Sequence, residues 1–309
     1  MPDRRDQITE TLRQRILRGL HAGNLSVGDR LPSARELGAE FETDHRVVLD
    51  AYRQLGEEGL IEMRRRGGIY VAAPPGFADG MPPISATWLT DLLTQGVSRE
   101  IPVSELHEWL RQSVETLRLR AVVVAGTQDQ VAGLVRELRD DFGLEASGLH
   151  VTALSNGAAL PIEVRRTDLL LTTEAHAEAV GRFARHLRKP CITISVRPDL
   201  IGGEWRLLLR KPVYVVAADE GFIDVLSRFF SGTPNAANLR PLVIGRDDLG
   251  AIPTGASVYV TQKAKDLLGD TRIQGNVLPA PRTISTHSAR AIIGFIVREN
   301  LRSLAARRA

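Results

Sequence analysis

The sequence predicts an α/β protein in which a winged helix-turn-helix is followed by a two-lobed parallel α/β domain. Short helix patterns and an apolar hairpin occupy the first 76 residues. Residues 73–83 then contain four prolines and two glycines, a composition typical of a boundary. From residue 120 onward, short apolar runs alternate with amphipathic helix patterns, which indicates a parallel sheet.

These observations also predict the domain limits. We expect a winged helix-turn-helix at residues 1–76, a linker at 77–85, and an α/β domain for effector binding and dimerisation at 86–309. Within that domain, lobe one is expected at about 100–196 plus 280–309, and lobe two at about 197–279.

Composition narrows the possible function classes. The single cysteine, Cys191, excludes an intrachain disulfide and a cysteine-based zinc cluster, and the seven histidines lack ligand spacing. We therefore expect no metal and no cofactor. No apolar run approaches the ~20 residues needed to span a bilayer, and residues 1–6 lack the apolar core of a signal peptide. The chain is expected to be cytoplasmic, without a membrane partner.

The first 76 residues are neutral in sum. They contain 12 arginines, no lysine, and 12 aspartates and glutamates. Any positive surface must therefore come from the placement of the arginines and not from an excess of them.

Three helices and a hairpin are expected in this part. Residues 6–22 place Ile8, Leu12, Ile16 and Leu20 on one helical face. The second helix covers about 33–41, where Ser33 can cap the amide of Glu36, and Asp44 is a good N-cap for the third helix. The expected buried stripe of that third helix is Val47 or Val48, Ala51, Tyr52 and Leu55. Residues 60–63 and 69–72 form the hairpin.

The first 76 residues contain the run GDRLPSAREL at 28–37, the segments 51–55 and 58–61, the wing at 67–71, and the entry helix with Ile16 and Gly23. In these residues this part resembles the GntR family of bacterial transcription regulators. The resemblance covers about a quarter of the chain. It implies a sequence-specific regulator that binds a double-stranded DNA operator as a homodimer. The sequence has His45 where such proteins commonly have Arg, so the operator sequence cannot be carried over.

The resemblance also assigns roles to residues. Arg35 would hold a phosphate or base edge, His45 and Arg46 would enter the major groove, and the wing would reach the minor groove or flanking phosphates. The wing residues concerned are Arg64, Arg65, Arg66, Gly67 and Gly68. Structural alternatives remain open: Arg35 as a partner of Glu36 or Glu40, and the wing arginines as a solvated turn.

The α/β region is expected to resemble a periplasmic-binding-protein sensor. Strands are expected at 121–125, 150–153, 168–172, 191–196, 213–217, 242–244 and 257–260, with helices at 128–142, 174–187, 221–230 and 285–305. The word Leu-Arg-Lys-Pro occurs twice, at 187–190 and 209–212, where one series ends and another begins. The repeat favours two lobes, with coincidence as the alternative.

An effector of unknown identity is expected at the carboxyl ends of the strands, between the lobes. The candidate ligand-binding residues are Gly126, Thr127, Gln128, Asn156, Thr172, Thr173 and Asp219. Each loop can instead be an ordinary helix cap. Neutral donors there favour a small anionic metabolite, whereas Asp129 and Glu174 favour a cation or a sugar.

We expect no enzymatic activity and therefore no catalytic residue. None of the four lysines has a convincing Schiff-base context, no Gly-x-Ser-x-Gly elbow occurs, and Cys191 lies in a strand pattern typical of an inert thiol. A metabolic enzyme fused to a DNA reader and an architectural DNA-binding protein remain the alternatives. Residues 103–119 carry an apolar stripe that packs within its own domain or forms the dimer face: Leu106, Trp109, Leu110, Val114 and Leu117.

Overall fold

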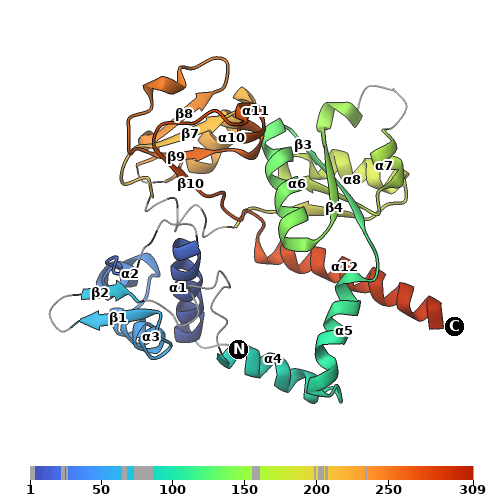
Figure 1. Cartoon of the computed structure of the whole chain (residues 1–309), viewed down its shortest axis with the longest axis horizontal. Helices are drawn as coiled ribbons and strands as arrows, with labels where there is room; N and C mark the ends of the chain where they lie inside the picture. Colours follow the sequence, from blue (N-terminus) through green and yellow to red (C-terminus); the bar gives the residue numbers. More distant parts are fainter. Residues whose placement is uncertain are drawn as a thin grey trace. The chain divides into compact units, whose positions relative to one another are not determined.

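The computed structural model (Figure 1) describes residues 4–21, 25, 27–64, 68–72, 86–154, 161–197, 200, 205, 208–233 and 235–308. The chain divides into two compact units, Met1–Val103 and Ser104–Ala309. No helix in the described ranges is long and apolar enough to cross a membrane.

The first unit contains three helices and a hairpin, followed by one further helix. Its elements are α1 (Arg4–His21), α2 (Ala34–Glu40), α3 (His45–Glu57), β1 (Ile61–Arg64), β2 (Gly68–Val71) and α4 (Ala86–Val97). β1 and β2 pair antiparallel, with Arg64 opposite Gly68 and Glu62 opposite Tyr70. This arrangement confirms the predicted winged helix-turn-helix fold.

One apolar core joins the first three helices and the hairpin. Ile8, Leu12, Ile16 and Leu20 are buried, as the helical spacing predicts. The predicted stripe of α3 is also buried: Val48, Ala51, Tyr52 and Leu55. The core orients α3 so that its opposite side faces solvent.

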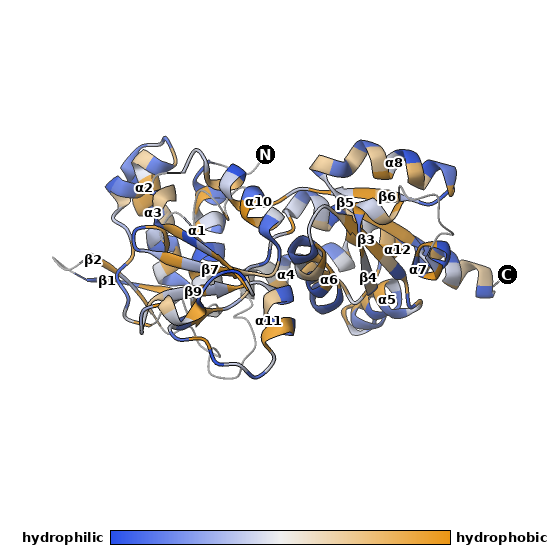
Figure 2. Cartoon of the chain, turned by 90° about the horizontal axis from the view of Figure 1, so that it is seen from above, coloured by the Kyte–Doolittle hydropathy of each residue, from blue (hydrophilic) through white to orange (hydrophobic). Residues whose placement is uncertain are grey.

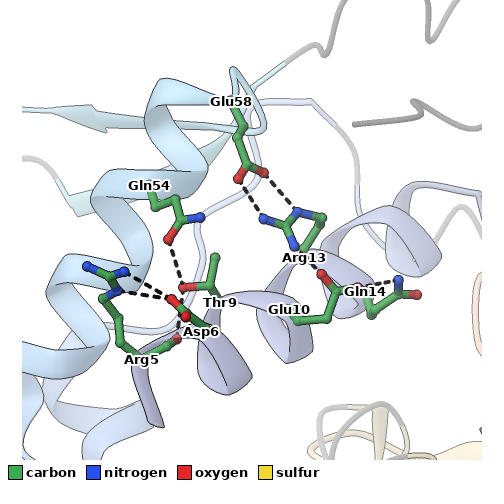
Figure 3. Close-up of polar contacts among 8 residues, drawn as sticks. All are labelled: Arg5, Asp6, Thr9, Glu10, Arg13, Gln14, Gln54 and Glu58. Atoms are coloured by element: carbon green, nitrogen blue, oxygen red, sulfur yellow. Dashed lines mark hydrogen bonds and ion pairs between the residues drawn. The ribbon is translucent and has the colours of Figure 1, made fainter. Parts of the chain in front are cut away.

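Polar contacts fasten α1 to α3 at their rims (Figure 3). The guanidinium of Arg13 makes two hydrogen bonds to the carboxylate of Glu58, at 2.8 and 2.6 Å. Near the other end of the contact, the hydroxyl of Thr9 lies 3.4 Å from the amide oxygen of Gln54. Because both partners of the Arg13 pair are largely shielded from solvent, this arginine serves the fold.

The second unit begins with α5 (Val103–Glu115, whose first residue falls in the first unit) and holds two parallel sheets of four strands. The first sheet has the order β4-β3-β5-β6. Its strands are β3 (Arg120–Ala125), β4 (Glu145–His150), β5 (Leu169–Thr173) and β6 (Cys191–Ile194). The connecting helices are α6 (Gln128–Phe142), α7 (Ile162–Arg166) and α8 (Ala177–His186), with short 3₁₀ turns at Val151–Leu154 and Glu174–His176.

The second sheet has the order β10-β9-β7-β8. If the strands of each sheet are numbered one to four along the chain, both sheets have the order 2-1-3-4. Its strands are β7 (Val213–Ala217), β8 (Leu239–Val243), β9 (Ser257–Val260) and β10 (Asn276–Leu278). Its helices are α10 (Glu220–Phe230) and α11 (Gln262–Leu268), with 3₁₀ turns at Ala236–Asn238 and Leu249–Ala251. In each sheet, the first strand lies between the second and the third. These two sheets confirm the predicted α/β class.

The repeated word Leu-Arg-Lys-Pro does not mark this structural repeat. Residues 187–190 lead into β6, the fourth strand of its sheet, whereas residues 209–212 lead into β7, the first strand of the other. The two occurrences therefore stand at non-equivalent positions, although they lie where one α/β series ends and the next begins, as the sequence analysis placed them.

Both faces of the first sheet are covered. Alternate residues of β3 enter two cores, with Ala121 and Val123 on one face and Val122 and Val124 on the other. The carboxy-terminal helix α12 (Thr286–Arg308) packs on the former face through Ile292, Phe295 and Ile296. In Figure 2 the ribbon of β3 is accordingly mostly in the hydrophobic colour. A sheet covered on both faces leaves its edges as the places for a ligand.

Candidate nucleic-acid interface and effector site

The helix-turn-helix is set by two helix caps. The hydroxyl of Ser33 accepts the Glu36 amide at 3.3 Å, and the Glu36 carboxylate accepts the Ser33 amide at 2.8 Å. The Asp44 carboxylate accepts the Arg46 amide at 2.8 Å and so starts α3. Both predicted caps are confirmed. They place the amino-terminal turns of α2 and α3 at the surface, where unpaired amides and the helix dipole favour anions.

The turn between the two helices depends on a buried glycine that the sequence analysis did not single out. A Cβ added to Gly38 would lie 3.1 Å from the carbonyl oxygen of Thr43 and 3.3 Å from the backbone nitrogen of His45. Both neighbours are backbone, so neither yields easily. Gly38 therefore lets the first residue of α3 approach α2 closely, which fixes where His45 and Arg46 stand.

Most described arginines of residues 4–72 are used within the fold. Arg13 pairs with Glu10 and Glu58, Arg15 with Glu40, Arg5 with Asp6, Arg53 with Asp50 and Arg64 with Glu62, while Arg4 donates to the carbonyl of Phe41. Three exposed guanidiniums, those of Arg30, Arg35 and Arg46, have no hydrogen bond or ion pair with any residue the structure describes. Among the described side chains of residues 4–72, these three arginines carry positive charge that no neighbouring carboxylate neutralises.

Arg35 and His45 lie together. Both line a shallow depression at the α2–α3 turn, together with Gly38, Glu42 and Asp44. The His45 ring nitrogen Nδ1 is 3.2 Å from the Asp44 carboxylate, and half of the side chain is exposed. Arg46 is exposed on the first turn of α3. Glu40, a candidate structural partner for Arg35, is instead paired with Arg15 at 2.7 Å.

The wing holds its first arginine in place. The guanidinium of Arg64 lies 2.9 Å from the Glu62 carboxylate and 4.3 Å from the centre of the Tyr70 ring. Hydrogen bonding to Arg64 lowers the pKa of Glu62, and the same contact raises the pKa of Arg64. Gly68 has a φ of +109°, a conformation that side chains rarely adopt. Arg65, Arg66 and Gly67 lie outside the described residues.

The candidate effector residues gather where the carboxyl edges of the two sheets meet. Thr127 caps α6 by accepting the Gln130 amide at 3.2 Å. The Gln128 amide donates to Asp219 at 3.1 Å, and Asp219 also caps α10 by accepting the Gly221 amide at 2.8 Å. Asp219 thus joins a loop of one sheet to a loop of the other.

Asp129 is the centre of this junction. Its carboxylate accepts the Ala218 and Asp219 amides, at 3.1 and 2.8 Å, and the hydroxyl of Thr261. Burial raises the pKa of Asp129, although its three hydrogen bonds oppose the shift. The sequence analysis treated Asp129 as facing a ligand, whereas its carboxylate is here bonded to the second sheet. We call Asp129, Ala218, Asp219 and Thr261 the junction.

The next strand, β5, ends beside the junction with two threonines of different character. The hydroxyl of Thr172 is fully buried and donates to the Val124 carbonyl at 2.9 Å, so it serves the sheet. The buried hydroxyl oxygen of Thr173 has no partner among the described residues. Buried polar atoms rarely stay unpaired, which makes Thr173 a candidate for ligand contact. Asn156 lies outside the described residues.

Two histidines that the sequence analysis did not select flank Gly126. The His150 nitrogen Nε2 lies 2.7 Å from the Gly126 carbonyl oxygen. A Cβ on Gly126 would lie 2.5 Å from the Nε2 of His176. Gly126 therefore belongs to a crowded polar edge of β3. His150 is the last residue of β4 and His176 lies in the turn that follows β5, so the signal was a histidine at the carboxyl end of each of two strands of one sheet.

A separate concavity of about 560 Å³ lies at the opposite, amino-terminal edge of the first sheet. Its charged lining residues are Arg120, Arg139, Glu145, Glu163 and Arg166. Arg139 is bonded to the carbonyl of Ala146, and Arg120 lies 3.7 Å from Asp168. The rule that ligands bind at strand carboxyl ends did not point to it.

Cys191 begins β6, and burial raises the pKa of its thiol. The thiol is therefore less ionised at neutral pH than a free cysteine, and a poorer nucleophile.

Residues 5–71 match the family model described as bacterial regulatory proteins, gntR family. The HTH-type transcriptional repressor YtrA of Bacillus subtilis is 28% identical over 109 residues, which are 35% of this chain and 81% of YtrA. The Uxu operon regulator of Haemophilus influenzae is 33% identical over 69 residues, which are 22% of this chain and 24% of that protein. A solved GntR family transcriptional regulator from Listeria monocytogenes has 22% identity over 36% of this chain and 95% of its own, with a TM-score of 0.28.

Proposed function

We propose that the chain is a transcriptional regulator whose residues 5–71, which match the gntR family model, bind a specific double-stranded DNA operator, and that a small-molecule effector controls this affinity. The observation that carries the DNA-binding part is the pair of exposed arginines, Arg35 at the start of α2 and Arg46 at the start of α3, whose guanidiniums have no partner among the described residues.

The geometry supports a division of labour. Arg46 and His45 stand on the first turn of α3, the part of a recognition helix that contacts base edges in the major groove. Arg35, on the first turn of α2, is suited to a phosphate, because the capped helix end adds amides and a favourable dipole. Phosphate contacts set the register, and base contacts set the sequence.

The direct test is selection of bound duplexes from a random DNA library by the full chain. We expect enrichment of a roughly two-fold symmetric site. Recovery of no common sequence, with equal affinity for selected and random duplexes, would contradict a specific operator and favour an architectural protein.

The same proposal includes a homodimer, because two-fold symmetry doubles the contacts to a symmetric site. The predicted stripe on α5 supports it: Leu106 is buried, whereas Trp109, Leu110 and Val114 are 45–47% exposed. Sedimentation is the test. A monomer in solution that also binds a single half-site as a monomer would contradict the dimer.

The effector part rests on the second unit. Two parallel sheets of the same strand order meet at their carboxyl edges, the region where such sheets bind ligands. The neutral donors there favour a small anion. Asp129 was expected to repel an anion, but its carboxylate is hydrogen-bonded within the junction, so this objection is weaker. Glu174 is exposed nearby and still favours a cation or a sugar.

Calorimetry of the full chain against separate panels of carboxylates, phosphates and sugars tests this part. We expect one class to bind, and Thr173→Val, which keeps the side-chain shape, to weaken that binding. Arg166→Ala, in the concavity at the other edge, serves as the comparison. If Arg166→Ala lost ligand binding and Thr173→Val kept it, the ligand would bind in that concavity and not at the junction. A bound ligand that leaves operator affinity unchanged would contradict effector control.

A further inference from the structure

The wing has a third segment that its sequence does not reveal. Residues 28–31 run along β2 and exchange backbone hydrogen bonds with it: Gly28 donates to Val71, Val71 to Asp29 and Leu31 to Ile69, at 2.8 to 2.9 Å. Within this segment, Arg30 forms an antiparallel bridge with Tyr70. The wing is therefore widened on the side of β2.

The bridge fixes the direction of the Arg30 side chain. Residues that lie directly opposite each other in a sheet project from the same face, so Arg30, Tyr70 and Glu62 share one face. Arg64 also lies on this face, because its guanidinium stacks on the Tyr70 ring. The Arg64 guanidinium thus stacks on the Tyr70 ring, and Arg30 projects from the same face of the sheet.

Gly68 provides the space for Arg30. A Cβ on Gly68 would lie 3.0 Å from the Nε of Arg30, 3.4 Å from its Nη2 and 3.5 Å from its Cζ. Three guanidinium atoms therefore lie close to the backbone of Gly68, the first residue of β2. A larger residue at position 68 would displace the guanidinium.

The two guanidiniums differ in their charge balance. Arg64 is paired with Glu62, whereas Arg30 is exposed and has no hydrogen bond or ion pair with any residue that the structure describes. An exposed arginine held by sheet pairing at its backbone loses less freedom on binding an anion than one on a free loop. A DNA phosphate is the anion that a wing meets.

We propose that Arg30 is a DNA-contacting residue of the wing, and that its guanidinium, lodged against Gly68, binds a phosphate of the operator backbone. The inference rests on the proposed DNA-binding function and adds a residue to it. A phosphate contact carries no sequence information, so its loss weakens specific and random DNA alike.

The test measures the affinity of the full-length protein for its selected operator and for a random duplex over a range of salt concentrations. For Arg30→Ala we expect about tenfold weaker binding to both duplexes. A plot of log affinity against log salt concentration has a negative slope. We expect the magnitude of this slope to decrease by about 0.9 for each phosphate contact that is lost. Arg30→Lys keeps the charge and should keep the slope. Arg182→Ala on α8, which removes an arginine already paired with Glu178, controls for net charge.

Gly68→Ala provides a second variant: it displaces Arg30 without removing it, and it also strains the backbone at a φ of +109°. Its affinity loss should resemble that of Arg30→Ala, and little further loss should appear when the two are combined. Thermal unfolding of each variant separates these effects from misfolding.

The outcomes separate the two claims. Wild-type affinity and salt slope in Arg30→Ala, with operator binding lost in Arg46→Ala, would overturn the role of Arg30 and leave the proposed function standing. Wild-type binding in both variants would overturn this inference and the assigned DNA interface together.

Discussion

At the scale of single residues, the useful distinction among the arginines is whether each already has a partner. Arg13 and Arg15 are bound within the fold by Glu58 and Glu40, so they cannot also neutralise a phosphate without breaking the core rim. Arg30, Arg35 and Arg46 have no such partner among the described residues. A neutral segment thus presents positive charge on one set of elements.

Replacing Arg46 by Ala should weaken binding to the best operator by about 1–3 kcal/mol and relax base preference at the position it contacts. The reason is the loss of a base contact, with phosphate contacts retained. Competition between the operator and its single-base variants is the measurement. Equal losses on operator and random DNA would show that Arg46 contacts the backbone only.

Asp129 gives a residue-scale prediction for the second unit. In Asp129→Asn, an NH₂ group replaces one of the two oxygens that accept the Thr261 hydroxyl and the Ala218 and Asp219 amides, so at least one buried donor loses its partner. We expect the free energy of unfolding to fall by about 1–3 kcal/mol in urea titration. Asp140→Ala, an exposed aspartate on the same helix, is the control and should change it little.

The pH dependence of that difference has a definite sign. Burial raises the pKa of Asp129 above 3.8, so the folded state binds more protons than the unfolded state between these two values. The stability from this group is therefore greatest at acid pH and is lost as pH rises through the raised pKa. The difference between wild type and Asp129→Asn should shrink from about pH 4 toward pH 7. A difference that grows over this range would contradict the raised pKa.

At the scale of elements, alanine substitutions at two glycines test the close approach of α2 and α3 in the helix-turn-helix. Gly38→Ala should destabilise the fold by about 1–3 kcal/mol and weaken operator binding, because the new Cβ meets backbone atoms at 3.1 and 3.3 Å. Gly56→Ala is the matched control, since its Cβ would have no contact closer than 3.9 Å and Ala favours the helix. A Gly38→Ala protein as stable and as active as Gly56→Ala would refute the close approach.

Elements with strong local signals were predictable from the sequence. The helix at 128–142 was predicted with its observed bounds, because Thr127 caps its start and Gly143 ends it in the left-handed conformation. The strand expected at 150–153 was wrong: β4 is Glu145–His150, and residues 151–154 form a 3₁₀ turn. The apolar pattern of β4 is weak, because it contains Glu145, Ser147 and Gly148, so the sequence did not indicate its position. β10, with three residues, and α11 were not predicted for the same reason.

The site was predictable only in part, because partners far apart in sequence decide which side chains are available. The positions of Arg35, His45 and Arg46 at helix starts followed from caps. That Glu40 is taken by Arg15 does not follow, since 25 residues separate them. Likewise, nothing local to Asp129 predicts its bonds to residues about 90 and 132 positions away.

At the scale of the whole molecule, the proposed function assigns DNA binding to the winged helix-turn-helix of the first unit and effector binding to the paired α/β sheets of the second. If an effector prefers one state of the junction by about 1–3 kcal/mol, operator affinity changes roughly 5- to 150-fold, and the operator changes effector affinity by the same factor. This reciprocity distinguishes control by an effector from a ligand that merely stabilises the second unit.

The measurement that tests the central claim most directly is the ratio of affinities of the full chain for its selected operator and for random duplex DNA at one physiological salt concentration. A specific regulator predicts a ratio of at least about 10³, and Arg46→Ala should reduce it. A ratio near one, unaffected by Arg46→Ala, would contradict sequence-specific recognition through the first turn of α3.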